Sequence, residues 1–168
     1  MNTSRPINVL VLCTGNSARS VLGEALFNHL GEGRVRAFSA GSKPSGTVNP
    51  VALETLEKHG VTVPSGVRSK SWDEFAAPGA PQLDYIFTVC ASAAGEVCPI
   101  WPGHPATAHW GIDDPAHVEP LAARRDAFEV AYRHLERRIR AFLALPLETL
   151  SADEVKAAAR RIHEEAGQ

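Results

Sequence analysis

The sequence is short of the features that mark several large classes of protein. Its 168 residues contain only three cysteines, and no apolar run approaches the ~20 residues that a membrane-spanning helix needs. A small, odd number of cysteines argues against a structural disulfide framework and favours a reducing compartment. The first residues, Met1–Pro6, are polar and contain no signal-peptide core. We therefore expect a cytoplasmic protein that does not enter a membrane.

The sequence also lacks a strong excess of charge of either sign. The formal net charge is −2, with 21% charged and 44% hydrophobic residues, which is ordinary for a globular domain. Nucleic acids and anionic membranes attract strongly basic surfaces, so neither is an expected partner. No repeat or low-complexity segment interrupts the chain, and its length suits one core. We expect a single domain over residues 1–168.

Strands and helices are expected to alternate along the chain. Segments that are continuously apolar, or rich in residues that favour strands, occur at 7–12, 35–39, 83–89 and 106–112 and are expected to form strands. Helical spacing of apolar residues or capping signals occur at 20–30, 49–60, 125–145 and about 151–165. This order predicts an α/β fold, a three-layer sandwich with a four-stranded parallel sheet and an appended last helix. Ligands of such sheets bind at the carboxyl ends of the strands.

The most informative stretch joins the first strand to the first helix. It reads Cys13-Thr14-Gly15-Asn16-Ser17-Ala18-Arg19-Ser20. A tight loop at this point turns backbone N–H groups toward the positive end of the helix dipole. Arg19 adds a forked donor that matches a tetrahedral oxyanion, and the same donors favour the thiolate of Cys13. A buried structural cysteine and a solvated arginine are the alternative, but the combination favours a nucleophile in an oxyanion cradle.

Two other places carry candidate chemistry. Cys90 follows the third expected strand, and Cys98 comes eight residues later through a linker that suits either a helical turn or a loop. A core cysteine with an incidental neighbour is one interpretation of this pair; zinc binding is not expected, because no histidine pair accompanies it. Asp114 precedes Pro115, a dipeptide that also starts turns and helices.

Taken together, these motifs resemble a known family. The Cys13 loop, Phe38-Ser39-Ala40-Gly41, Cys90-x7-Cys98-Pro99 and His109-Trp110-Gly111-Ile112-Asp113-Asp114-Pro115 are similar to the thioredoxin-coupled arsenate reductases of the low-molecular-weight protein tyrosine phosphatase fold. The resemblance covers most of residues 7–145.

The resemblance implies a reaction and a role for each residue. Arsenate, or phosphate as a competing oxyanion, binds the N–H groups of residues 14–19 and the Arg19 side chain. Cys13 attacks arsenic, Asp114 acts as the general acid, and Ser20 hydrogen-bonds the Cys13 sulfur. A disulfide then passes from Cys13–Cys90 to Cys90–Cys98, and thioredoxin reduces it. No organic cofactor is implied.

The sequence departs from the family pattern at three positions. Ala116 stands where tyrosine phosphatases of this fold have an aromatic residue, which weighs against a phosphotyrosine substrate. Ala18 replaces a further cysteine of some members. Lys70 stands where potassium-binding relatives have an acid, and that puts a metal site formed by Asn16, Glu24 and Ser39 in doubt. Lys70 either substitutes for the cation or points into water.

Two other functions stay open from the sequence. A phosphomonoesterase would use Cys13, Arg19 and Asp114 through a thiophosphate intermediate. A non-enzymatic oxyanion sensor or redox-regulated binding module would use the loop alone. Arsenate consumption driven by a thiol reductant distinguishes the reductase from the phosphatase, and turnover of any kind distinguishes both from the sensor.

Overall fold

The computed structural model describes residues 6–63, 67–90 and 106–166. In these ranges the chain forms the following elements: β1 (Ile7–Cys13), α1 (Arg19–Gly31), β2 (Val35–Gly41), α2 (Pro50–Lys58), the 3-10 helix η1 (Trp72–Phe75), β3 (Tyr85–Thr88), β4 (Ala106–His109), α3 (Leu121–Leu143) and α4 (Ala152–Ala166).

The four strands form one parallel sheet in the order β2-β1-β3-β4, which confirms the predicted α/β fold. Cys13 is paired with Gly41 on β2, while Leu12 is paired with Thr88 on β3. The carboxyl ends of these three strands therefore meet at one edge of the sheet. That edge is where ligands bind in folds of this kind.

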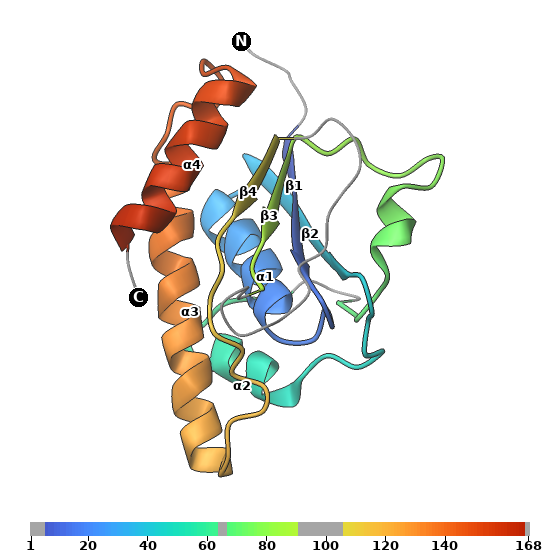
Figure 1. Cartoon of the computed structure of the whole chain (residues 1–168), viewed down its shortest axis with the longest axis vertical. Helices are drawn as coiled ribbons and strands as arrows, with labels where there is room; N and C mark the ends of the chain where they lie inside the picture. The colour runs from blue at the N-terminus through green and yellow to red at the C-terminus, as the bar shows by residue number, and fades with distance from the viewer. Residues whose placement is uncertain (1–5, 64–66, 91–105, 167–168) are drawn as a thin grey trace.

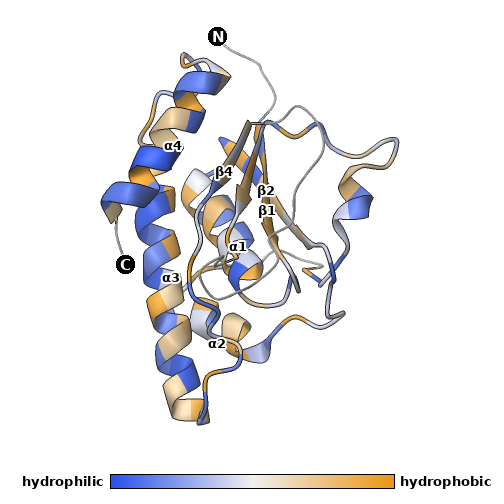
Figure 2. Ribbon diagram, viewed as in Figure 1, coloured by the Kyte–Doolittle hydropathy of each residue, from blue (hydrophilic) through white to orange (hydrophobic). Residues whose placement is uncertain are grey.

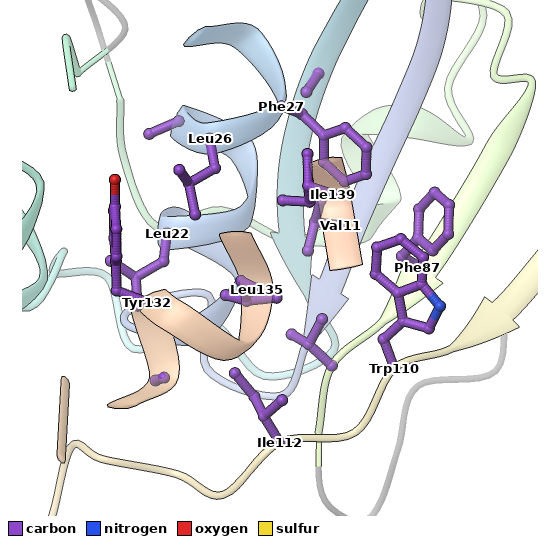
Figure 3. Packing of buried hydrophobic residues seen from close by; sticks show 14 of the residues in the cluster. Val11, Leu22, Leu26, Phe27, Phe87, Trp110, Ile112, Tyr132, Leu135 and Ile139 are labelled. Atoms are coloured by element: carbon purple, nitrogen blue, oxygen red, sulfur yellow. The ribbon is translucent and has the colours of Figure 1, made fainter. Parts of the chain in front are cut away.

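The larger hydrophobic core lies between the sheet and the helices α1, α3 and α4, which cover the same face (Figure 1). Aromatic rings form its centre: Phe87 lies 4.2 Å from Trp110 and 5.0 Å from Phe142, between ring centroids. Figure 3 shows how side chains of the strands and the helices point toward one another in this core. Burial of these large apolar side chains is the main source of the fold's stability.

The other face of the sheet has a smaller core. Leu10, Leu12 and Ile86 are fully buried there, and Trp72 and Phe75 of η1 pack over them. Figure 2 shows the strands as mostly hydrophobic, whereas α3 and α4 carry hydrophilic stretches along their length. Strands buried on both faces explain why their sequences are continuously apolar rather than alternating.

The capping signals place two helices as predicted. Asn49 accepts a hydrogen bond from the Val51 N–H at 2.9 Å and starts α2. At the start of α4, Ser151 N–H donates to Glu154 Oε1 at 2.8 Å, and Glu154 N–H donates to Ser151 Oγ at 3.1 Å. These reciprocal bonds form the expected capping box.

The ends of other elements differ from expectation. The strand expected over 106–112 ends at His109, but Trp110 and Ile112 N–H still donate to Thr88 and Val89 carbonyls, at 2.7 and 3.2 Å. The chain therefore continues along β3 beyond the regular ladder. Helix α3 begins at Leu121, four residues before its expected start, directly after Pro120.

Helix α4 is attached to the core by polar contacts as well as by Val155 and Ala159. The indole N–H of Trp110 donates to the Ala159 carbonyl at 2.9 Å, and Arg138 Nε donates to His163 Nδ1 at 3.0 Å. Buried polar groups need such partners, so these bonds fix where α4 docks. None of the helices in the described ranges is long and apolar enough to cross a membrane.

Candidate active site

Cys13 is the last residue of β1 and lines a cavity of about 480 Å³. Its thiol is free and only 3% exposed. The loop that follows leads directly into α1, and no side chain caps the start of that helix. A sulfur at this position faces the positive end of the helix dipole.

The carbonyl groups of the loop after Cys13 accept hydrogen bonds from neighbouring segments of the chain. Three of them accept backbone N–H groups of segment 42–49 at 2.9 Å: Thr14 from Lys43, Gly15 from Ser45 and Ser17 from Asn49. The Ser69 hydroxyl adds a bond of 3.0 Å to the Gly15 carbonyl. Segment 42–49, which follows β2, therefore fixes the shape of the loop.

Buried side-chain hydrogen bonds also fix the loop beneath its base. Asn16 is fully buried, adopts a left-handed conformation with φ of 45°, and donates to Ser20 Oγ at 2.8 Å and Ser39 Oγ at 2.9 Å. Ser20 Oγ also lies 3.0 Å from Cys13 Sγ, and its hydroxyl is the donor of this pair once Cys13 is a thiolate. This order of donors stabilises negative charge on the sulfur.

Arg19 and Asp114 meet across the cavity. The Arg19 side chain is almost fully buried and donates from Nη1 to the Ile112 carbonyl at 3.0 Å. Its Nη2 lies 3.5 Å from Asp114 Oδ2. The other oxygen, Oδ1, accepts the Ala116 N–H at 2.9 Å, so Asp114 makes both the turn and the ion pair.

The remaining predicted residues are placed only in part. Cys90 is fully buried two residues after β3, and it is disulfide-bonded. Cys98 lies outside the described residues. The Ser17 hydroxyl donates to the Thr47 carbonyl at 2.9 Å, which ties the loop to segment 42–49.

Part of the cavity wall was not predicted from the sequence. Besides the Cys13 loop and the expected Asp114 and Ala116, the cavity is lined by His117 and, in segment 42–49, by Ser42, Lys43, Ser45 and Asn49. Residues 41–46 had been expected only as a loop and Asn49 only as a helix cap, so segment 42–49 was not expected at the site. The pairing of Cys13 with Gly41 brings it to the cavity, and a parallel pairing of the first two strands was the one signal that suggested this.

Residues 8–157 match the family described as low molecular weight phosphotyrosine protein phosphatase. The chain belongs to this family. Among curated relatives, the arsenate reductase of Brevibacillus brevis is 36% identical over 125 residues, which are 74% of this chain and 89% of the relative.

Solved structures similar to this chain include arsenate reductases and a tyrosine phosphatase. An arsenate reductase from Archaeoglobus fulgidus has a TM-score of 0.60, 27% identity, and covers 79% of this chain and 98% of its own. A thioredoxin-dependent arsenate reductase of Corynebacterium glutamicum has a TM-score of 0.55 and 27% identity, and the match covers 83% of this chain and 64% of that protein. The tyrosine phosphatase amsI of Erwinia amylovora has a TM-score of 0.61 and 27% identity, and the match covers 83% of this chain and 93% of that protein.

The residues that match the family's potassium ligands do not fit a metal ion here. The Asn16 side-chain oxygen accepts the Lys70 backbone N–H at 2.8 Å, and Ser39 Oγ donates to Glu24 Oε1 at 2.5 Å. The Lys70 ammonium donates to the Arg68 carbonyl at 3.2 Å and acts on Glu24 through its charge. The contact of Lys70 with Asn16 is therefore made by its backbone N–H.

We predict that Lys70→Met destabilises the protein in a pH-dependent way. Burial raises the pKa of Glu24, while the Ser39 hydrogen bond and the Lys70 charge oppose that rise. Without Lys70 the folded-state pKa rises further, so the unfolded state releases its proton first and stability is lost as the pH increases. Burial also lowers the pKa of Lys70, a cost that the substitution removes at both pH values, so urea unfolding should show a loss near pH 8 that exceeds the one near pH 4 by about 2 kcal/mol.

The matched control is Lys58→Met, because Lys58 is exposed and contacts Glu129 at 3.5 Å on the surface. That variant should lose less than about 0.5 kcal/mol at either pH. Activity of the unsubstituted protein should not change when potassium replaces sodium at constant ionic strength. An equal loss of stability at both pH values, or activation specific to potassium, would contradict the role given to Lys70.

Proposed function

We propose that this chain is an arsenate reductase. The observation that carries the proposal is the placement of Cys13, Arg19 and Asp114 around one cavity of oxyanion-binding character. The carbonyls of the loop are engaged on its outer side, and we expect its amide groups to face the cavity. The curated relatives named arsenate reductase support this activity over others in the family.

The first step forms a bond between sulfur and arsenic. The oxyanion binds the loop and Arg19, and the Cys13 thiolate attacks arsenic(V). An oxygen leaves as water after Asp114 gives it a proton. The Ser20 hydroxyl, 3.0 Å from Cys13 Sγ, stabilises the thiolate before attack.

The second step reduces arsenic. The Cys90 thiolate attacks Cys13, the sulfur–arsenic bond breaks, and its electron pair stays with arsenic, which leaves as arsenite. Cys98 then attacks Cys90, which frees Cys13 and leaves a Cys90–Cys98 disulfide. A free Cys13 together with a disulfide-bonded Cys90 is the combination expected at the end of this sequence of steps.

A thioredoxin-type dithiol is the proposed reductant of that disulfide, in the reducing compartment of the cytoplasm. The thioredoxin dependence of the Corynebacterium glutamicum relative supports this choice. We also propose that the chain works as one catalytic domain, with α4 packed on its core. Phosphate is a competing oxyanion, because its shape and charge match those of arsenate.

The test is NADPH oxidation in the presence of arsenate, thioredoxin and thioredoxin reductase, repeated with a glutathione and glutaredoxin system. The unsubstituted protein should turn over with the first system. Cys98→Ser should release about one arsenite per protein and then stop, because its disulfide cannot leave Cys13. Sustained thioredoxin-driven turnover by Cys98→Ser would contradict the proposed order of sulfurs.

The phosphatase of the same family is the competing function, and the amsI likeness favours keeping it in the test. Hydrolysis of an aryl phosphate, measured on the same protein, distinguishes the two. We expect arsenate reduction to exceed aryl phosphate hydrolysis, because Ala116 leaves the cavity without the aromatic wall that holds a substrate ring. Aryl phosphate turnover without arsenate reduction would reject the reductase.

A further inference from the structure

The cavity above Cys13 has an unusual set of walls for a site that binds esters of large alcohols. In the described part of the chain, no leucine, isoleucine, valine, methionine, phenylalanine, tyrosine or tryptophan lines it. Its charged lining residues are Arg19, Lys43 and Asp114, and His117 also lines it. Such walls offer ionic contacts to a substrate and little apolar surface.

Lys43 is fixed at one side of this cavity. Its backbone N–H donates to the Thr14 carbonyl at 2.9 Å, so the start of its side chain is held against the oxyanion loop. The side chain itself is exposed, and Lys43 lines the same cavity as Asp114 and His117. The long, flexible stem of a lysine lets its ammonium reach over such an opening.

The charge of Lys43 has no carboxylate partner in the part of the chain that the structure describes. Within residues 6–63, 67–90 and 106–166, no carboxylate forms an ion pair with it, whereas Lys58 contacts Glu129 at 3.5 Å. Arg19 at the base of the site already lies 3.5 Å from Asp114. A bound dianion next to a thiolate therefore needs further positive charge, and Lys43 is placed to supply it.

Attack by Cys13 determines which oxygen faces Lys43. Cys13 is a buried lining residue of the cavity, so the oxygen in line with its sulfur, the leaving oxygen, is expected on the solvent side. In an inorganic oxyanion this oxygen is bare or protonated and accepts a hydrogen bond. In a phosphate monoester it carries carbon, which blocks that contact and brings an apolar group against the ammonium.

We propose that Lys43 is a specificity-determining residue that selects free inorganic oxyanions over phosphate monoesters. This inference rests on the proposed function and names the substrate class of the same site. Lys43 contacts the outermost oxygen of the bound anion. The residue thereby favours arsenate and phosphate as free ions and disfavours aryl phosphates.

The test measures binding without requiring turnover. Inorganic phosphate and phenyl phosphate are used separately to protect Cys13 from iodoacetamide, followed by mass spectrometry of the Cys13 peptide at low salt. For Lys43→Met, the half-protecting concentration of inorganic phosphate should rise about fivefold. That of phenyl phosphate should stay the same or fall, because methionine offers the ring apolar surface.

Three further variants and conditions separate a specific contact from a structural effect. Lys43→Arg should restore phosphate affinity to within about twofold, because the charge is retained. Lys58→Met should leave the half-protecting concentrations of both anions unchanged. High salt should reduce the difference between Lys43→Met and the unsubstituted protein, as expected of an exposed ionic contact. In arsenate turnover, Lys43→Met should raise KM with kcat unchanged.

The inference is overturned if the ratio of the two affinities moves less than twofold in Lys43→Met, or if both anions weaken equally. If neither anion protects Cys13 in the unsubstituted protein, the oxyanion site and the role of Lys43 fail together. If phosphate protects with the expected dependence on Lys43 but arsenate is not reduced, the proposed reaction fails and the role of Lys43 stands.

Discussion

Replacement of Asp114 by asparagine is expected to slow the first release of arsenite about a thousandfold, with oxyanion affinity kept within about threefold. An amide at this position keeps the acceptor for the Ala116 N–H, so the turn that presents the side chain is retained. It cannot give a proton to the departing oxygen. The effect should therefore fall on the chemical step and not on binding.

The measurement mixes fully reduced protein with excess arsenate and follows arsenite by rapid quench, so that the later disulfide exchange does not limit the observed rate. Binding is measured separately from protection of Cys13 by phosphate. Asp113→Asn is the matched control, because Asp113 is the neighbouring acid, is exposed and does not line the Cys13 cavity. Equal rates for Asp114→Asn and Asp113→Asn would remove Asp114 from the role of acid.

Local signals in the sequence predicted those parts of the molecule that depend on neighbouring residues. The Asn49 cap, the Ser151 and Glu154 capping box and the order of strands and helices are all decided within a few positions of the chain. Cys13, Arg19 and the loop between them also lie within one short, continuous stretch of sequence. The fold and the base of the site could therefore be predicted with their residue numbers.

The walls of the site could not be predicted in the same way, because they depend on contacts between distant segments. Lys43 reaches the cavity only because β2 pairs with β1 in a register that places Gly41 beside Cys13. Composition gives no sign of this, since Gly41 to Gly46 reads as an ordinary loop. The position of α4 has the same origin: its sequence predicts a helix, but Trp110 and Arg138 decide where it packs.

Lys70 lies between these two cases. Its replacement of an acid was visible in the sequence and put a metal site in doubt. Its contacts were not visible, because the residue uses its backbone N–H for Asn16 and its charge for Glu24. A backbone contact of this kind is independent of the side chain, and so no residue type at position 70 could have indicated it.

A methyl group added at Gly41 is expected to reduce oxyanion affinity about a hundredfold. An ideal Cβ at this position would lie 2.4 Å from the Thr14 carbonyl oxygen, 2.9 Å from the Cys13 carbonyl oxygen and 3.0 Å from the Asn16 nitrogen. All three are backbone atoms of the oxyanion loop, so no side-chain rotation relieves the contact. The loop must move, and its donors then lose their common direction toward the anion.

The same change should lower the free energy of unfolding by about 2 kcal/mol, as overpacking of a buried site does. Gly46→Ala is the control, because a Cβ there meets no atom within 4 Å while the φ of 86° makes alanine strained. Gly46→Ala should therefore lose about 1 kcal/mol of stability and keep its phosphate affinity. Urea unfolding and phosphate protection of Cys13 measure the two quantities. If Gly41→Ala loses stability but binds phosphate as the unsubstituted protein does, the loop does not depend on β2 for its shape.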